Sequence, residues 1–99
     1  MLKSICIIAA LSATPFAAQA QFSTAAQCTS LGGIAETIML LRQNGVPMSS
    51  VISKLDPEMY GALILFAYQQ PRYSSPSFQS RAIEEFRNGM ETACFKGLL

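Results

Sequence analysis

The chain has 99 residues, of which 51% are hydrophobic and 13% are charged, and its formal net charge is +1. This length allows one small domain and excludes a nucleotide-binding domain joined to a substrate domain. The nearly balanced charge provides no general field for nucleic acid, and the absence of His removes the commonest general base and the commonest metal ligand.

The first twenty residues have the pattern of a secretory signal peptide. Lys3 gives a positively charged start, an apolar stretch follows over 5–11, and a small-residue A-x-A cleavage site occupies 18–20. The apolar stretch is far shorter than the ~20 residues that a membrane-spanning helix needs. We therefore expect cleavage after Ala20, which leaves residues 21–99 as a periplasmic or secreted chain without a stable membrane span.

Removal of the signal peptide leaves two cysteines, Cys28 and Cys94. Because exported proteins fold in an oxidising compartment, we expect these thiols to form a disulfide rather than to stay free and buried. The bond would close most of the mature chain into a loop, for which the loop-entropy model gives roughly 4 kcal/mol. In a domain this small, that is a large share of the net stability.

The first expected helix covers 24–43, where apolar residues recur every three or four positions. The stripe consists of Cys28, Leu31, Ile34, Ala35, Ile38 and Leu41. Gly45 suits the left-handed position that ends a helix, and Pro47 prevents its continuation. We attribute the Gly32-Gly33 pair to the close approach of another helix rather than to a functional hinge, at a cost of about 1 kcal/mol per glycine.

A short helix is expected next, capped by Ser49 or Ser50 and ending near Leu55. The segment 56–58, Asp-Pro-Glu, is a sharper start signal, because Asp caps, Pro needs no N–H there and Glu is favourable in the first turn. The helix that follows, to about Gln70, is apolar on nearly every side. It is therefore either the central buried helix or a surface for another chain.

The polar connection 69–77 leads to a last helix, capped by Ser75 or Ser77 and ending near Lys96, where Gly97 closes it. Its apolar stripe consists of Phe78, Ala82, Ile83, Phe86, Met90, Ala93 and Cys94. The expected ion pairs on its outer face are Arg81–Glu85 and Arg87–Glu91.

The expected disulfide also predicts the topology. Cys28 lies near the start of the first helix and Cys94 near the end of the last, so they can meet only if these helices lie side by side and antiparallel. The predicted fold class is all-α. It is a small four-helix bundle of three longer helices and one short helix, with the first and last helices linked by Cys28–Cys94.

No residue pattern in the sequence supports catalysis. Without His, the remaining bases are six carboxylates and the mature-chain lysines, and neither Lys54 nor Lys96 has the spacing of a Ser-Lys nucleophile. Glu84 and Glu85 point about 100° apart on a helix, so one cleft receives at most one of them. We expect no enzyme, no cofactor and no metal, and the scattered basic residues predict no nucleic-acid partner.

Two surface features are candidates for binding an unidentified protein partner. The loop 69–75 carries Arg72 and Tyr73, residue types that are frequent in interface hot spots; the alternative is a plain connection with Tyr73 folded onto the core. The second feature is excess apolar surface, which either a homodimer or a client-binding groove would cover. This surface consists of Leu40, Met48, Leu65, Phe95, Leu98 and Leu99.

The layout of the chain resembles that of small uncharacterised exported helical proteins of proteobacteria and their prophages. The shared features are a signal peptide, a first helix with Cys28, a Gly-Pro turn, a Pro-Arg-Tyr loop and a last helix that contains the segment 81–94. The architecture of the chain is also similar to that of acid-stress periplasmic chaperones and of helical periplasmic immunity proteins that neutralise cell-wall amidase effectors. The resemblance brings no functional residues with it.

The function expected from the sequence is that of a periplasmic, non-catalytic protein-binding module. A stress chaperone or a structural protein is the first alternative, and an effector-immunity inhibitor is a more distant one. An acid-triggered chaperone needs groups that titrate, and a chain with six acidic residues and no His has few of them.

Overall fold

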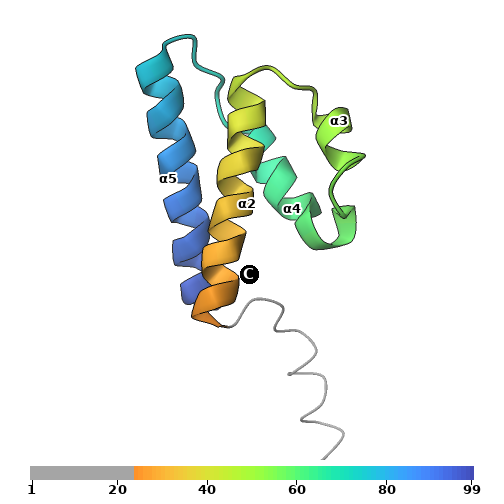
Figure 1. Ribbon diagram of the computed structural model, residues 1–99, viewed down its shortest axis with the longest axis vertical. Coiled ribbons are helices and arrows are strands. Elements are labelled where there is room, and N and C mark those ends of the chain that lie inside the picture. Colours follow the sequence, from red (N-terminus) through yellow and green to blue (C-terminus); the bar gives the residue numbers. More distant parts are fainter. Residues whose placement is uncertain (1–23) are drawn as a thin grey trace, which may run out of the picture.

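The computed structural model describes residues 24–99, so the expected signal peptide and its cleavage site lie outside the described residues. Residues 24–99 form four α-helices and no strand (Figure 1). The helices are α2 (Ala25–Gln43), α3 (Met48–Ile52), α4 (Pro57–Tyr68) and α5 (Pro76–Phe95). The prediction of an all-α bundle with three longer helices and one short helix is confirmed.

Local signals start α2 and α4. Thr24 accepts a hydrogen bond from the backbone N–H of Gln27, and the Gln27 side chain accepts one from the backbone N–H of Thr24, which completes a capping box. Asp56 accepts a bond from the backbone N–H of Glu58, and Pro57 takes the first helical position. The predicted start at Asp56 is therefore confirmed.

Helices α2 and α5 end in the same way. Gly45 and Gly97 have φ angles of 80° and 77°, a left-handed conformation that glycine adopts without steric penalty. At both ends, the N–H groups of the glycine and of the residue after it donate to carbonyls of the last helical turn, which is the Schellman motif. Both predicted helix ends are confirmed.

The cap predicted for the short helix was wrong, and the cap predicted for the last helix is confirmed in its position but not in its hydrogen bond. The short helix begins at Met48 and ends at Ile52, because Pro47 is already its N-cap residue and no serine side chain caps it. Ser75 stands at the N-cap of α5, but it makes no capping bond, since its hydroxyl lies 3.0 Å from that of Ser77.

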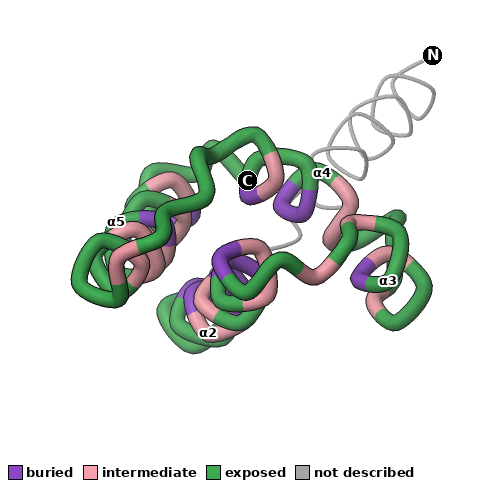
Figure 2. The backbone as a smooth tube through the Cα atoms, turned by 90° about the horizontal axis from the view of Figure 1, so that it is seen from above, coloured by how far each residue is buried: buried purple, intermediate pink, exposed green. Residues whose placement is uncertain are grey.

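The centre of the bundle is α2, against which the other three helices pack, while α4 and α5 hardly touch each other. Figure 2 shows the buried residues on the sides of the helices that face the interior. The buried apolar core consists of Cys28, Leu31, Ala35, Ile38, Met39, Val51, Leu63, Ile64, Ala67, Phe86 and Cys94. Seven residues of the predicted stripes are not fully buried: Phe78 is exposed, and the half-buried ones are Ile34, Leu41, Ala82, Ile83, Met90 and Ala93.

The Cys28–Cys94 disulfide joins the first turn of α2 to the end of α5, with the two Cα atoms 5.5 Å apart. The two helices lie side by side and run in opposite directions (Figure 1). The predicted pairing and topology are confirmed.

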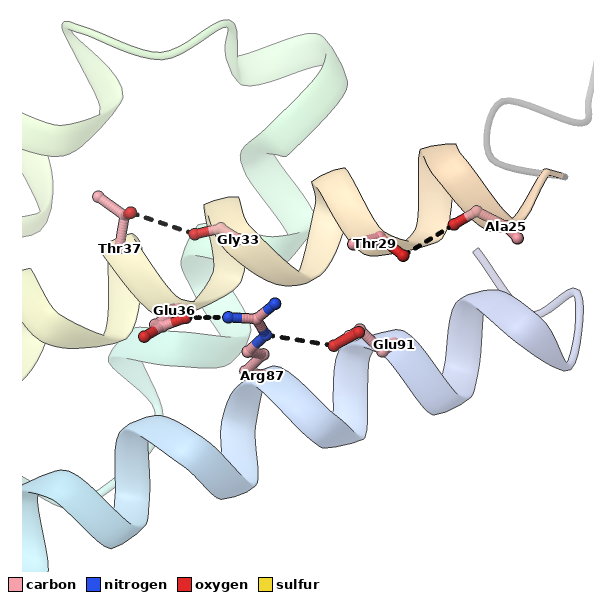
Figure 3. A network of polar contacts seen from close by, with 7 residues as sticks. All are labelled: Ala25, Thr29, Gly33, Glu36, Thr37, Arg87 and Glu91. Atoms are coloured by element: carbon pink, nitrogen blue, oxygen red, sulfur yellow. Dashed lines mark hydrogen bonds and ion pairs between the residues drawn. The ribbon is translucent and has the colours of Figure 1, made fainter.

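One of the two expected ion pairs forms, but it lies on the side of α5 that faces α2 and not on the outer face, and it belongs to a larger network (Figure 3). Arg87 pairs with Glu91 on its own helix at 3.2 Å and also with Glu36 of α2. These hydrogen bonds raise the pKa of Arg87, and the bond to Glu36 has the larger effect. The pair predicted for Arg81 was wrong, because its guanidinium lies over the Phe78 ring, 5.6 Å from the centroid.

The adjacent glycines of α2 have different environments. A Cβ on Gly32 would lie 2.5 Å from Cγ of Glu91, so a larger residue there would force this side chain of α5 to move. A Cβ on Gly33 would meet nothing within 4 Å. The close-approach interpretation is confirmed for Gly32 and was wrong for Gly33.

Gly33→Ala is expected to raise the free energy of unfolding by about 1 kcal/mol, because Ala is the better helix former and the site has room for its methyl group. Gly32→Ala is the matched change, and the clash with Glu91 should make it destabilising. Urea unfolding of both variants measures the difference. Equal effects of the two substitutions would contradict the assignment of different roles.

Candidate functional site

The described residues bring no cluster of metal ligands together, and they separate the two adjacent glutamates of α5. Within 24–99, no group of three or more His, Cys, Asp or Glu side chains could hold a metal ion. Glu84 and Glu85 line different surfaces: Glu85 lies in a cavity with Met39 and Phe66, and Glu84 in a depression with Leu40. Among these same residues, none of the helices has the length and apolar character to cross a membrane.

The loop 69–75 is held in place by Gln43, the one buried polar residue among those described. Its Nε2 donates to the carbonyl of Pro71 at 2.8 Å, and its Oε1 accepts from the N–H of Tyr73 at 2.8 Å. Both ends of the amide are therefore satisfied by loop backbone, which fixes the loop to the last residue of α2.

Two arginines at this end of the bundle donate to backbone carbonyls. Arg72 Nε donates to the carbonyl of Gln43 at 3.1 Å, and its guanidinium lies against Gly45. Arg42 donates through Nε and Nη2 to the carbonyl of Gln70, at 3.2 and 3.0 Å. The positive charge of Arg72 thus lies where the dipole of α2 favours a cation. This gives Arg72 a structural role, and its role in partner binding stays a prediction.

Tyr68 closes the same end of the bundle. Its hydroxyl donates to the carbonyl of Val46 at 2.6 Å, and the Arg42 guanidinium lies 5.4 Å from the centroid of its ring. Burial raises the pKa of Tyr68, and the nearby charge of Arg42 opposes that rise. The fold therefore favours the neutral phenol.

Tyr68→Phe is expected to lower the free energy of unfolding by about 1 kcal/mol at pH 7, because the Val46 carbonyl loses its donor. Since the folded pKa is raised, this contribution is present below the unfolded pKa of about 10 and is lost as the pH rises above it. Urea unfolding at neutral and alkaline pH should show the gap between the two proteins narrowing. A gap that stays constant would contradict the raised pKa.

Tyr73 is held by its backbone, while its ring stays at the surface. Its N–H donates to Gln43, and its carbonyl accepts from Gln79 Nε2 at 2.6 Å. The residue is 39% exposed, and its ring centroid lies 6.0 Å from that of Phe78. The ring is therefore only partly covered, and the choice between a binding loop and a plain connection stays open.

Two apolar cavities lie between α4 and α5, with residues of α2 in the lining of both. Their volumes are about 280 Å³ and 240 Å³, and Phe66 of α4 and Met90 of α5 line both of them. The two cavities are therefore neighbours, and we call them together the α4–α5 groove. Tyr73 lines the first cavity, at the loop end, and Leu99 lines the second. The groove exists because α4 and α5 both pack on α2 and not on each other.

Much of the groove is open apolar surface. Met59 is 47% exposed and Phe66 is 45% exposed, although both belong to a largely apolar helix. The sequence left open whether α4 is a central buried helix or a surface for another chain. Its inner side is buried through Leu63, Ile64 and Ala67, and its outer side is exposed as the second alternative requires. Sequence reasoning missed the exposure of Met59 and Phe66, because a helix that is apolar all round gives no signal for the side that stays uncovered.

The predicted excess of apolar surface is present in five of its six residues: Leu40, Leu65, Phe95, Leu98 and Leu99 are exposed. Met48 is half-buried against the core, so its inclusion was wrong. Of the five exposed residues, Leu99 is the one that lines the groove.

The charged residues in the lining of the groove are both acidic. Glu58, in the first turn of α4, lines the second cavity, and Glu85 of α5 lines the first. Neither carboxylate forms an ion pair among the described residues. No Lys or Arg belongs to the described lining of either cavity.

No protein-family model, no curated protein and no solved structure matches the chain. The resemblance to exported helical proteins of proteobacteria therefore stays a prediction. The features that point to a function are those of the chain itself, namely the anchored loop and the α4–α5 groove.

Proposed function

We propose that the protein is a non-catalytic protein-binding module of the periplasm or of the secreted fraction, and that it takes its partner in the α4–α5 groove. The observation that carries the proposal is the groove itself, an apolar depression with exposed Met59 and Phe66 along its sides and buried core residues at its base. Clustered apolar surface of this kind is typical of interaction sites on small proteins.

Two further observations support the proposal. The Cys28–Cys94 disulfide is typical of proteins that work in an oxidising compartment. The loop that places Tyr73 at the groove is anchored by Gln43 and by Arg72, so a partner would meet a preformed surface and would pay little to order it.

A stress chaperone is the second candidate, because three methionines line the groove and flexible thioether side chains adapt to clients of different shape. The residues are Met39, Met59 and Met90. This function requires protection of a client from aggregation under acid stress. A protein that stays folded and monomeric at low pH and protects no client would exclude it.

Site-directed photo-crosslinking tests the proposed function. A benzoylphenylalanine at Phe66, in the groove, is expected to give a discrete adduct with one partner in cells that make the protein. The control is the same group at Lys54, which is exposed and does not line the groove. The absence of an adduct at Phe66, or the same adducts from both positions, would contradict the proposal. An adduct of twice the protein's mass would identify a homodimer.

Tyr73→Ala is expected to change the free energy of unfolding by less than about 0.5 kcal/mol, because the ring is exposed and the backbone bonds to Gln43 and Gln79 remain. It should weaken capture of the crosslinked partner about tenfold, as loss of an aromatic anchor does at interfaces. Thermal unfolding and a pull-down measure the two effects. A large loss of melting temperature would mean that the ring supports the fold.

A further inference from the structure

We propose that the segment bound in the α4–α5 groove is a cationic amphipathic helix of the partner, with its apolar side in the groove and Lys or Arg side chains toward Glu58 and Glu85. This inference rests on the proposed function of the groove and names the chemistry of its occupant.

The acidic lining of the groove favours an occupant with basic side chains. The two charged residues of its lining, Glu58 and Glu85, stand on opposite walls and in different cavities. The nearby basic side chains are engaged with other groups. Arg42 and Arg72 donate to backbone carbonyls, and Arg87 pairs with Glu36 of α2 and Glu91 of α5. Arg81, one turn before Glu85, lies over the Phe78 ring and forms no ion pair among the described residues. A partner with basic residues along both edges of its apolar stripe therefore complements the groove at both walls.

The architecture favours a helix as the occupant. Residues 24–99 contain no strand, so they offer no sheet edge to which an extended segment could add. An apolar depression between two helices, with exposed aromatic and methionine side chains, is the setting in which an amphipathic helix places its apolar side. The methionines of the lining allow the walls to adapt to the side chains of the occupant.

Gly89 leaves room on the wall of the groove for the backbone of a docked helix. It lies inside α5, where glycine costs about 1 kcal/mol relative to alanine, and it lines the first cavity. A Cβ at this position would meet nothing within 4 Å, so the fold of residues 24–99 does not itself require a glycine there. A glycine on the wall of a groove allows the backbone of a docked helix to come close.

The test uses the oxidised protein and two synthetic helices of about 18 residues, or five turns. Both carry a leucine stripe and a single Trp, and they differ only in having Lys or Glu beside the stripe. Because the protein contains no Trp, the fluorescence of the peptide reports binding without interference. The Lys peptide is expected to bind at least about tenfold more tightly than the Glu peptide.

Two matched pairs of variants locate the interaction. Glu85→Lys should reduce the preference for the Lys peptide, whereas Glu84→Lys, with the same net charge but outside the groove, should not. Gly89→Leu should block binding of the Lys peptide, while Gly33→Leu, at a glycine of α2 outside the groove lining, should leave it intact. The helical circular dichroism of each variant serves as the control for folding.

The possible outcomes separate this inference from the proposed function. Equal binding of both peptides, blocked by Gly89→Leu, would overturn the cationic helix while leaving the groove as a binding site. Binding of neither peptide, or binding that Gly89→Leu leaves unchanged, would overturn the inference. In that case crosslinking at Phe66 decides separately whether the groove binds a protein at all.

Discussion

Reduction of the Cys28–Cys94 disulfide is expected to lower the free energy of unfolding by about 4 kcal/mol. The bond closes a loop with a sequence separation of 66 residues, and the reduced chain regains that conformational freedom when it unfolds. Native domains are stable by only about 5–15 kcal/mol, and a domain as small as this lies toward the lower end. The reduced protein should therefore be close to unfolding at physiological temperature.

Urea unfolding of the oxidised and reduced protein measures this effect. The matched control is the double variant Cys28→Ala and Cys94→Ala, which should be about as unstable as the reduced protein and should not respond to reductant. Alanine is chosen because both sites are buried and a serine hydroxyl would need a new partner there. A reduced protein within about 1 kcal/mol of the oxidised one would contradict the role given to the disulfide.

Gln43→Leu has the second-largest expected effect, a loss of about 2–3 kcal/mol. Leucine has similar bulk, but it leaves the Pro71 carbonyl and the Tyr73 N–H without the partners that Gln43 gives them. The loop 69–75 should then lose its fixed position on α2, and partner binding through Tyr73 should weaken with it. Urea unfolding and amide hydrogen exchange of Tyr73 measure the two consequences.

Gln43→Glu is the matched control for the two hydrogen bonds. As a carboxylate it keeps the acceptor for the Tyr73 N–H, but it has no donor for Pro71 and its charge is buried. When protonated it can donate again, so the stability of this variant relative to the wild type should recover as the pH falls. Two results would contradict the role given to Gln43. One is a loss of stability by Gln43→Glu that does not depend on pH, and the other is a free energy of unfolding that Gln43→Leu leaves unchanged.

The parts of the fold that could be predicted depend on local chemistry. The Asp56-Pro57 start and the Gly45 end are set by backbone hydrogen bonds within a few residues, so the sequence around them is sufficient. The topology followed from Cys28 and Cys94 because a single covalent bond between distant residues restricts how the helices can lie.

The candidate site could not be predicted in the same way, because it depends on how the helices sit around α2. Helical periodicity assigns Phe66 and Met90 to apolar sides of their helices, but it does not give the gap that separates those sides. Gln43 was missed for a related reason. A glutamine at a helix end is typical of the surface, and its burial depends on a loop about 30 residues further along the chain.

The most direct test of the α4–α5 groove as the binding site is an NMR titration. The amide chemical shifts of the isotope-labelled protein are measured while the partner identified by crosslinking is added. Signals of the groove residues, among them Phe66, Gly89 and Met90, should shift, while those of Leu40 and Ser49 on other surfaces should stay in place. Shifts concentrated around Leu40, or spread evenly over the four helices, would contradict the groove as the binding site.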